Sequence, residues 1–220
     1  MRSFLNILIL LNLFFLVACK QGNESDLVSD GLIEVPVAKA NIISFTSPQE
    51  LVTYVAAPEN GYYKEKEIDN IKYSALLKPI DFIKANEALK SDGIKVSDDD
   101  DLQYFDFRVT VKDFSMEFLK FDLSSPDEYA QRVEYCAFKM QKDIYLIDGK
   151  DTLQCEMFHF ERAYDLVPYG HFILAFVPSK NKTMISPKTL VYHDQLFNKG
   201  LIKFTFTTNN LINVPKLSKL

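Results

Sequence analysis

The residues best suited to chemistry are a histidine and a glutamate two positions apart, His159 and Glu161. Side chains of an extended strand alternate between its two faces, so both residues are expected to point to the same side. They can supply two ligands to a metal ion such as Zn²⁺, or a general base and the carboxylate that orients it. A metal-dependent hydrolase would take a third ligand from His171 or His193, on other expected strands. We favour the alternative, a strand-end pair that bonds locally and to Arg162, because the three scattered histidines match no known ligand spacing.

A run of four aspartates, Asp98–Asp101, is the densest group of oxygen ligands in the chain. Calcium prefers about six to eight oxygen ligands, which such a run could begin to supply. The ligand spacing of a calcium-binding EF-hand loop and its glycine are absent, and adjacent carboxylates cannot all turn towards one ion. We therefore expect a solvated loop tip, since runs of like charge commonly stay in water. No cofactor is expected, with Ca²⁺ here or Zn²⁺ at the histidines as the alternatives.

Three tyrosines, Tyr62, Tyr63 and Tyr104, are the candidate binding residues. Tyrosine joins a flat apolar ring to a polar hydroxyl, and it is enriched at binding surfaces. These residues could stack on the sugar rings of a glycan or on a peptide. The alternative is that they cover the neighbouring core, which is the more common role of tyrosines on a hairpin.

Motifs of common catalytic machineries are missing. The chain contains neither a G-x-S-x-G nucleophile elbow nor the H-E-x-x-H metal motif. It also lacks a glycine-rich loop of the kind that binds phosphate groups. The sequence therefore provides no specific reason to propose an enzyme and favours a non-enzymatic binding protein.

The start of the chain has the pattern of an export signal. An apolar run, Phe4–Val17, follows Arg2 and ends at the small residue Ala18. Its length lies within the roughly 7–15 residues of a signal-peptide core and below the about 20 of a membrane-spanning helix. The last residues, Leu16-Val17-Ala18-Cys19, resemble the lipobox of bacterial lipoproteins. The resemblance covers only this segment, and it implies that residues 1–18 are removed and that Cys19 carries the lipid.

A lipid on Cys19 would anchor the protein to a membrane of the bacterial cell envelope. Lys20 and Gln21 follow the cysteine where an acidic residue would signal retention in the inner membrane, so the outer membrane is favoured and the face stays open. Removing Arg2 with the signal changes the formal charge from −5 to −6. This mild acidity argues against a nucleic-acid partner. The expected partner is an envelope protein or a glycan, and a purely structural assembly role is the alternative.

Two further cysteines, Cys136 and Cys155, remain in the mature chain. Export leads to an oxidising compartment, which favours a disulfide between them. The alternative is a pair of buried free thiols, because cysteine is among the most buried residue types.

The mature chain divides by composition. Residues 19–44 are largely polar and predict a flexible tether. Residues 45–220 predict a single folded domain, with two sub-parts joined near 113–127 as the alternative. Capping signals at Ser47 and Ser125 predict helices over 49–57 and 126–134, and Pro79 opens another over 79–89.

Strand patterns fill the rest of the folded part. A hairpin is expected over 62–68 and 71–77, with Asp69-Asn70 at its turn. In the strand over 102–112, the alternation buries Phe105, Phe107, Val109 and Val111 and leaves Tyr104, Asp106, Arg108 and Thr110 on a solvent side. Later strands are expected over 135–140, 144–147, 152–160, 171–177, 189–193 and 201–207. We therefore predict an α+β fold, an N-terminal hairpin-helix-strand unit followed by a mainly antiparallel, β-sandwich-like sheet.

Overall fold

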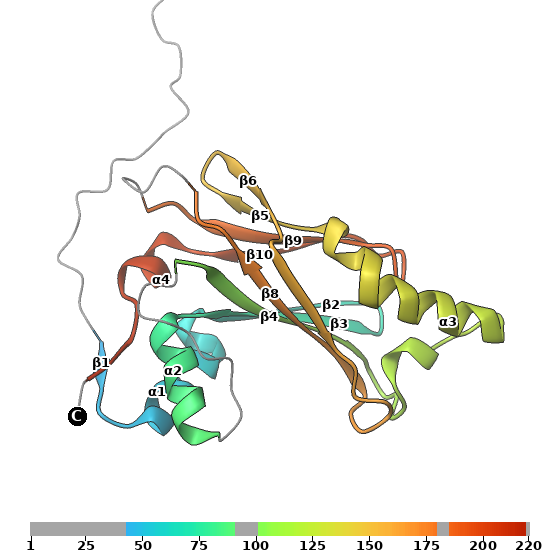
Figure 1. The fold of residues 1–220 in the computed structure, drawn as a ribbon, viewed down its shortest axis with the longest axis horizontal. Coiled ribbons are helices and arrows are strands. Elements are labelled where there is room, and N and C mark those ends of the chain that lie inside the picture. The colour runs from blue at the N-terminus through green and yellow to red at the C-terminus, as the bar shows by residue number, and fades with distance from the viewer. Residues whose placement is uncertain (1–42, 91–100, 180–184, 219–220) are drawn as a thin grey trace, which may run out of the picture. The chain divides into compact units, whose positions relative to one another are not determined.

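Figure 1 shows the computed structural model, which describes residues 43–90, 101–179 and 185–218. The lipobox with Cys19, the expected tether up to residue 42 and Asp98 to Asp100 lie outside these residues. Within them, none of the helices has the length and apolar character needed to cross a membrane.

Two antiparallel sheets form the body of the fold. The five-stranded sheet contains, in spatial order, β2 (Tyr63–Ile68), β3 (Ile71–Lys78), β4 (Gln103–Val111), β8 (Tyr169–Phe176) and β7 (Met157–Glu161). The four-stranded sheet contains β10 (Gly200–Phe206), β9 (Lys188–Asp194), β5 (Ile144–Asp148) and β6 (Asp151–Gln154). Helices accompany both sheets, so the predicted α+β fold is confirmed.

The core lies between the two sheets. The ring of Phe105 on β4 lies 5.6 Å from that of Phe206 on β10, and the ring of Phe107 lies 5.3 Å from that of Tyr192 on β9. All four side chains are essentially inaccessible to solvent. The alternation predicted for β4 therefore places its apolar face against the other sheet, as in a sandwich.

The other elements are short. They are β1 (Ser44–Phe45), α1 (Pro48–Ala56), η1 (Pro58–Asn60), α2 (Ile80–Leu89), η2 (Phe118–Lys120), α3 (Pro126–Glu134), η3 (Tyr135–Lys139), η4 (Met140–Asp143), α4 (Thr208–Ile212) and β11 (Lys216–Leu217). The predicted caps are present, since Ser47 accepts from Glu50 N at 3.5 Å and Ser125 from Glu128 N at 3.3 Å. Local capping therefore starts α1 and α3 where the sequence indicates.

The strand predicted over 135–140 is wrong, because this segment is helical. The η3 turn has π-helical hydrogen bonds and continues α3 directly, and η4 follows it. Cys136 and Met140, four residues apart, are both buried, whereas Phe138 between them is 78% exposed. A continuous apolar run fits a strand and a buried helix equally well, so periodicity alone could not decide between them.

The single strand predicted over 152–160 is two strands in different sheets. Residues 151–154 pair with β5 as β6, and residues 157–161 pair with β8 as β7. The chain crosses between the sheets at Cys155 and Glu156, where Glu156 N donates to Ala175 O at 2.9 Å. The crossing moves His159 and Glu161 onto the five-stranded sheet.

Residues 113–127 were expected as a possible join between two sub-parts. In the structure, part of this segment is packed in the core. Phe118 and Leu119 of η2 are buried in a cluster that also contains residues of both sheets. Gly170 on β8 lies directly against the ring of Phe118, and a Cβ atom there would overlap that ring. Close packing of η2 on the sheet thus requires glycine at position 170, because any larger residue would place a side chain where the Phe118 ring lies.

Candidate functional site

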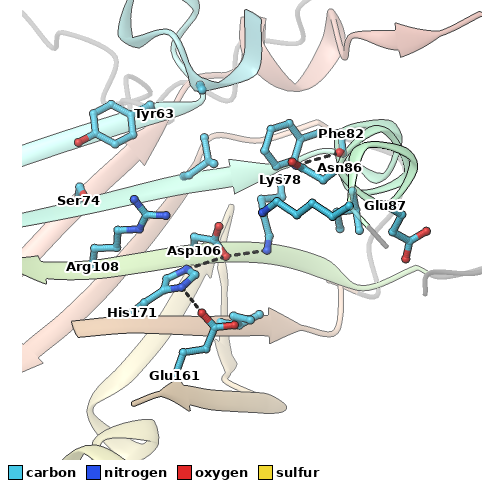
Figure 2. A pocket seen from close by; sticks show the side chains of 15 residues that line it. Tyr63, Ser74, Lys78, Phe82, Asn86, Glu87, Asp106, Arg108, Glu161 and His171 are labelled. Atoms are coloured by element: carbon cyan, nitrogen blue, oxygen red, sulfur yellow. Dashed lines mark hydrogen bonds and ion pairs between the residues drawn. The ribbon is translucent and has the colours of Figure 1, made fainter. Parts of the chain in front are cut away.

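A groove of about 520 Å³ lies on the outer face of the five-stranded sheet, the face turned away from the four-stranded sheet. Its floor is formed by side chains of β3, β4, β8 and β7, and one wall is formed by Phe82 and Ile83 of α2 (Figure 2). The polar residues of the floor are Ser74, Lys78, Asp106, Arg108, Glu161 and His171. The outer face is therefore the solvent side expected for β4, partly covered by a helix.

Four charged or titratable side chains on the groove floor form one connected chain across four strands (Figure 2). Lys78 Nζ donates to Asp106 Oδ1 at 2.6 Å, and His171 Nε2 lies 3.4 Å from the same oxygen. On its other side, His171 Nδ1 lies 2.5 Å from Glu161 Oε2. The imidazole thus sits between two carboxylates, one of which is also neutralised by a lysine.

The centre of this chain is shielded from water. The Lys78 and Asp106 side chains are 11% and 15% exposed. Burial alone would raise the pKa of Asp106, but the hydrogen bond with His171 and the charge of Lys78 outweigh it and lower the pKa below its usual value. Asp106 is therefore held as a carboxylate at neutral pH.

The arrangement around His171 leaves no ring nitrogen for a substrate. A neutral imidazole donates one hydrogen bond and accepts another, whereas an imidazolium donates two. Here Nδ1 is bonded to Glu161 Oε2 at 2.5 Å, and Nε2 is buried away from solvent with Asp106 Oδ1 3.4 Å away. General-base catalysis needs a nitrogen within reach of the reacting proton, so the geometry favours a role in holding the groove floor together.

The histidine that lines the groove is His171, and no hydrogen bond or ion pair joins the described residues His159 and Glu161. His159 and Glu161 do share the outer face, where they are register partners of Ile173 and His171. His193 lies on β9 in the other sheet and contacts Gln195. In the described ranges, no three His, Cys, Asp or Glu side chains are arranged to hold a metal ion. The metal-dependent hydrolase thus stays a prediction from sequence.

Only one of the three candidate tyrosines lines the groove. Tyr63 is half-buried there, and its hydroxyl donates to Glu65 at 2.9 Å. Tyr62 is 2% exposed and donates to Asn210 O at 2.7 Å, and Tyr104 is 4% exposed. Tyr62 and Tyr104 therefore match the alternative reading, in which tyrosines cover the core.

The two cysteines do not form the predicted disulfide in this structure, where both are free and buried. Burial raises the pKa of the Cys155 thiol to about 12, and it raises that of Cys136 as well. Neither sulfur is available as a thiolate at neutral pH, which argues against a reactive thiol at either position.

Sequence reasoning placed Asp106 and Arg108 on a solvent face but did not single them out, and it missed Lys78 entirely. Alternation within a strand tells which residues share a face, but not which strands lie side by side. The chain from Lys78 to Glu161 exists because β8 pairs with both β4 and β7.

Comparisons of this chain with models of protein families, with curated proteins and with solved structures found no match. The class of the protein is defined by its own fold and site, an α+β sandwich with a groove on one outer face.

The Asp106→Asn variant tests the charge chain through the pH dependence of stability. A carboxyl with a lowered pKa stabilises the fold above its unfolded pKa, near 4, and this contribution is lost as pH falls through the folded pKa. We expect the variant to be less stable at pH 7 and to lose less stability than wild type below pH 4. Urea unfolding monitored by circular dichroism between pH 2 and 7 measures both effects. The matched control is Glu59→Gln, an exposed carboxylate without an ion pair among the described residues, and an acid response of Asp106→Asn equal to wild type would contradict the prediction.

Proposed function

We propose that this chain is a lipid-anchored protein of the bacterial cell envelope that binds another envelope component without acting as an enzyme. The lipobox at Leu16–Cys19 supports the anchor, and Lys20 with Gln21 favours the outer membrane. The component bound is a protein or a glycan, taken up by the groove on the five-stranded sheet.

The groove is the observation that carries the binding role. Its volume of about 520 Å³ falls within the roughly 300–1,000 Å³ of ligand sites. Apolar side chains of α2 and the sheet stand beside polar and charged groups of both, so a ligand could make apolar and polar contacts in the same groove. Because Nδ1 of His171 is bonded to Glu161 and its Nε2 is buried away from solvent, the site favours binding over catalysis.

Site-specific photo-crosslinking in intact cells tests this role. Tyr63 is replaced by the photoreactive analogue p-benzoylphenylalanine, which keeps the aromatic ring and carries a benzoyl group in place of the hydroxyl. The matched control places the same analogue at Tyr145, a half-buried tyrosine on the outer face of the other sheet. We expect a discrete crosslinked envelope product from position 63 and none of the same mass from position 145. No product from position 63, or the same product from both positions, would count against the proposal.

A further inference from the structure

Two cationic side chains that line the groove, Lys90 at the end of α2 and Arg108 on β4, make no ion pair with a described residue, and the one on the groove floor is Arg108. It is exposed on β4, and it makes no ion pair with any residue that the structure describes. Its guanidinium carbon lies 5.0 Å from the centre of the Tyr169 ring. Stacking on a ring face leaves the N–H groups at the edge of a guanidinium available, and their planar fork matches a carboxylate.

The other cationic groups of the charge chain are already satisfied. Lys78 is bonded to Asp106, and His171 lies between Asp106 and Glu161. On the groove floor, an anionic ligand would have to compete with these carboxylates everywhere except at Arg108. On the groove floor the carboxylate of a ligand is therefore expected at Arg108, with Lys90 on the α2 side as the other cation that has no ion pair among the described residues.

Next to Arg108, the groove has an apolar side. Phe82 and Ile83 of α2 face Leu76 and Ile173 of the sheet around the same hollow. Water in such a hollow is readily replaced by an apolar group, whereas the hydroxyl groups of a sugar would lose hydrogen bonds there. The ligand that fits both features combines a carboxylate with a neighbouring apolar group.

The outer face continues into a second hollow of about 450 Å³. Lys72 and Thr110 line this second hollow and are register partners. Each lies two residues along its strand from Ser74 or Arg108, which pair with one another in the first groove. Together the two hollows follow β4 from Asp106 to Val111, a length of about 17 Å at about 3.3 Å per residue. An extended chain of about six residues would span this distance, which a compact small molecule would not.

We propose that the groove binds an extended acidic peptide segment, with a carboxylate on Arg108 and an adjacent apolar side chain between α2 and the five-stranded sheet. The inference rests on the proposed function, because it names the ligand of the same groove. A peptide is favoured over a glycan because the apolar side chains of Leu76, Phe82, Ile83 and Ile173 gather on one side of the hollow beside Arg108.

The test uses the mature, lipidated full chain in detergent and two hexapeptide libraries that are N-acetylated and C-amidated. In one library every peptide has a Glu next to Leu, Ile or Phe, and in the other Gln replaces that Glu. We expect the Glu library to be retained about tenfold better or more, since charge-assisted pairs are the stronger ones. Arg108→Gln should bring the ratio close to one, and Arg108→Lys should leave an intermediate ratio because it keeps the charge without the fork.

The matched control variant is Lys203→Gln, which removes an exposed cation from β10 on the other sheet and should leave the ratio unchanged. Thermal melts of all variants exclude unfolding as a cause. Equal retention of both libraries, or a preference for Glu that survives Arg108→Gln, would overturn the inference.

Two outcomes separate this inference from the binding role itself. If neither library binds but the crosslink from position 63 persists, the peptide is wrong and the groove remains a binding site. Arg108-dependent binding of a uronic-acid tetramer in that case would identify a glycan as the occupant. If peptides fail and no crosslink forms, both proposals fail.

Discussion

In cells that produce the Cys19→Ser variant, we expect the protein to leave the membrane fraction almost completely. A single acyl chain binds a bilayer only weakly, with a constant of roughly 10⁴ M⁻¹, whereas two lipid signals give stable attachment. A lipobox cysteine is expected to carry a diacylglycerol, which supplies two chains through one sulfur. Serine offers no thiol for this modification, so the variant loses the whole anchor. Fractionation and immunoblotting measure the change.

The neighbouring substitution Lys20→Ser is the matched control, because it changes the tether and keeps the cysteine. This variant should stay with the membrane. Mass spectrometry of the wild-type protein should find a chain that begins at an acylated Cys19. Membrane retention of Cys19→Ser, or an unmodified mature N-terminus elsewhere, would contradict the anchor.

The Asp194→Ala variant is expected to lose about 3–5 kcal/mol of unfolding free energy, because each buried donor left without its acceptor costs about 1–3 kcal/mol. Asp194 is 2% exposed and lies between the sheets at the end of β9. It accepts hydrogen bonds from the hydroxyls of Tyr73 at 2.7 Å and Tyr192 at 3.0 Å. Backbone N–H groups of residues 196, 197 and 199 also donate to its carboxylate.

Alanine at this position would leave these donors without their acceptor, and several of them are buried away from water. A domain of this kind has only about 5–15 kcal/mol of stability, so the loss is a large share of the total. Because the chain has no tryptophan, urea unfolding is best followed by circular dichroism.

Two further variants check the cause of the loss at Asp194. Tyr73→Phe removes one donor with little change in shape and should cost about 1 kcal/mol. The exposed Lys203→Ala should change stability by less than about 0.5 kcal/mol. If Asp194→Ala were as mild as Lys203→Ala, the buried network would not be a main support of the sandwich.

Much of the local structure follows from short-range signals in the sequence. Ser47 and Ser125 cap α1 and α3, the helices whose starts they predict. Asp69 adopts the positive φ of 54° that the hairpin turn between β2 and β3 needs. The alternation of Phe105 and Phe107 with Asp106 and Arg108 sets the two faces of β4. Such features depend on a residue and its near neighbours, which is why they could be predicted.

Ambiguity begins where an apolar run lacks a clear period. Residues 135–140 fit a strand by composition, but burial of Cys136 and Met140 on one side of a helical segment decides otherwise. Residues 152–160 look continuous, yet their two halves pair with different strands. Long-range pairing is a property of the whole fold and has no signal within the segment itself.

By itself the sequence determined the helix starts, the faces of β4 and the α+β class, because each depends on local spacing, and it predicts the lipobox in the same way. Only the tertiary structure decided that Tyr63 lines a groove while its neighbour Tyr62 is buried. It also decided that Glu161 meets His171 and that Arg108 is left without an ion pair among the described residues. The physical reason is that a strand's period assigns a side chain to a face, whereas its partners come from strands tens of residues away.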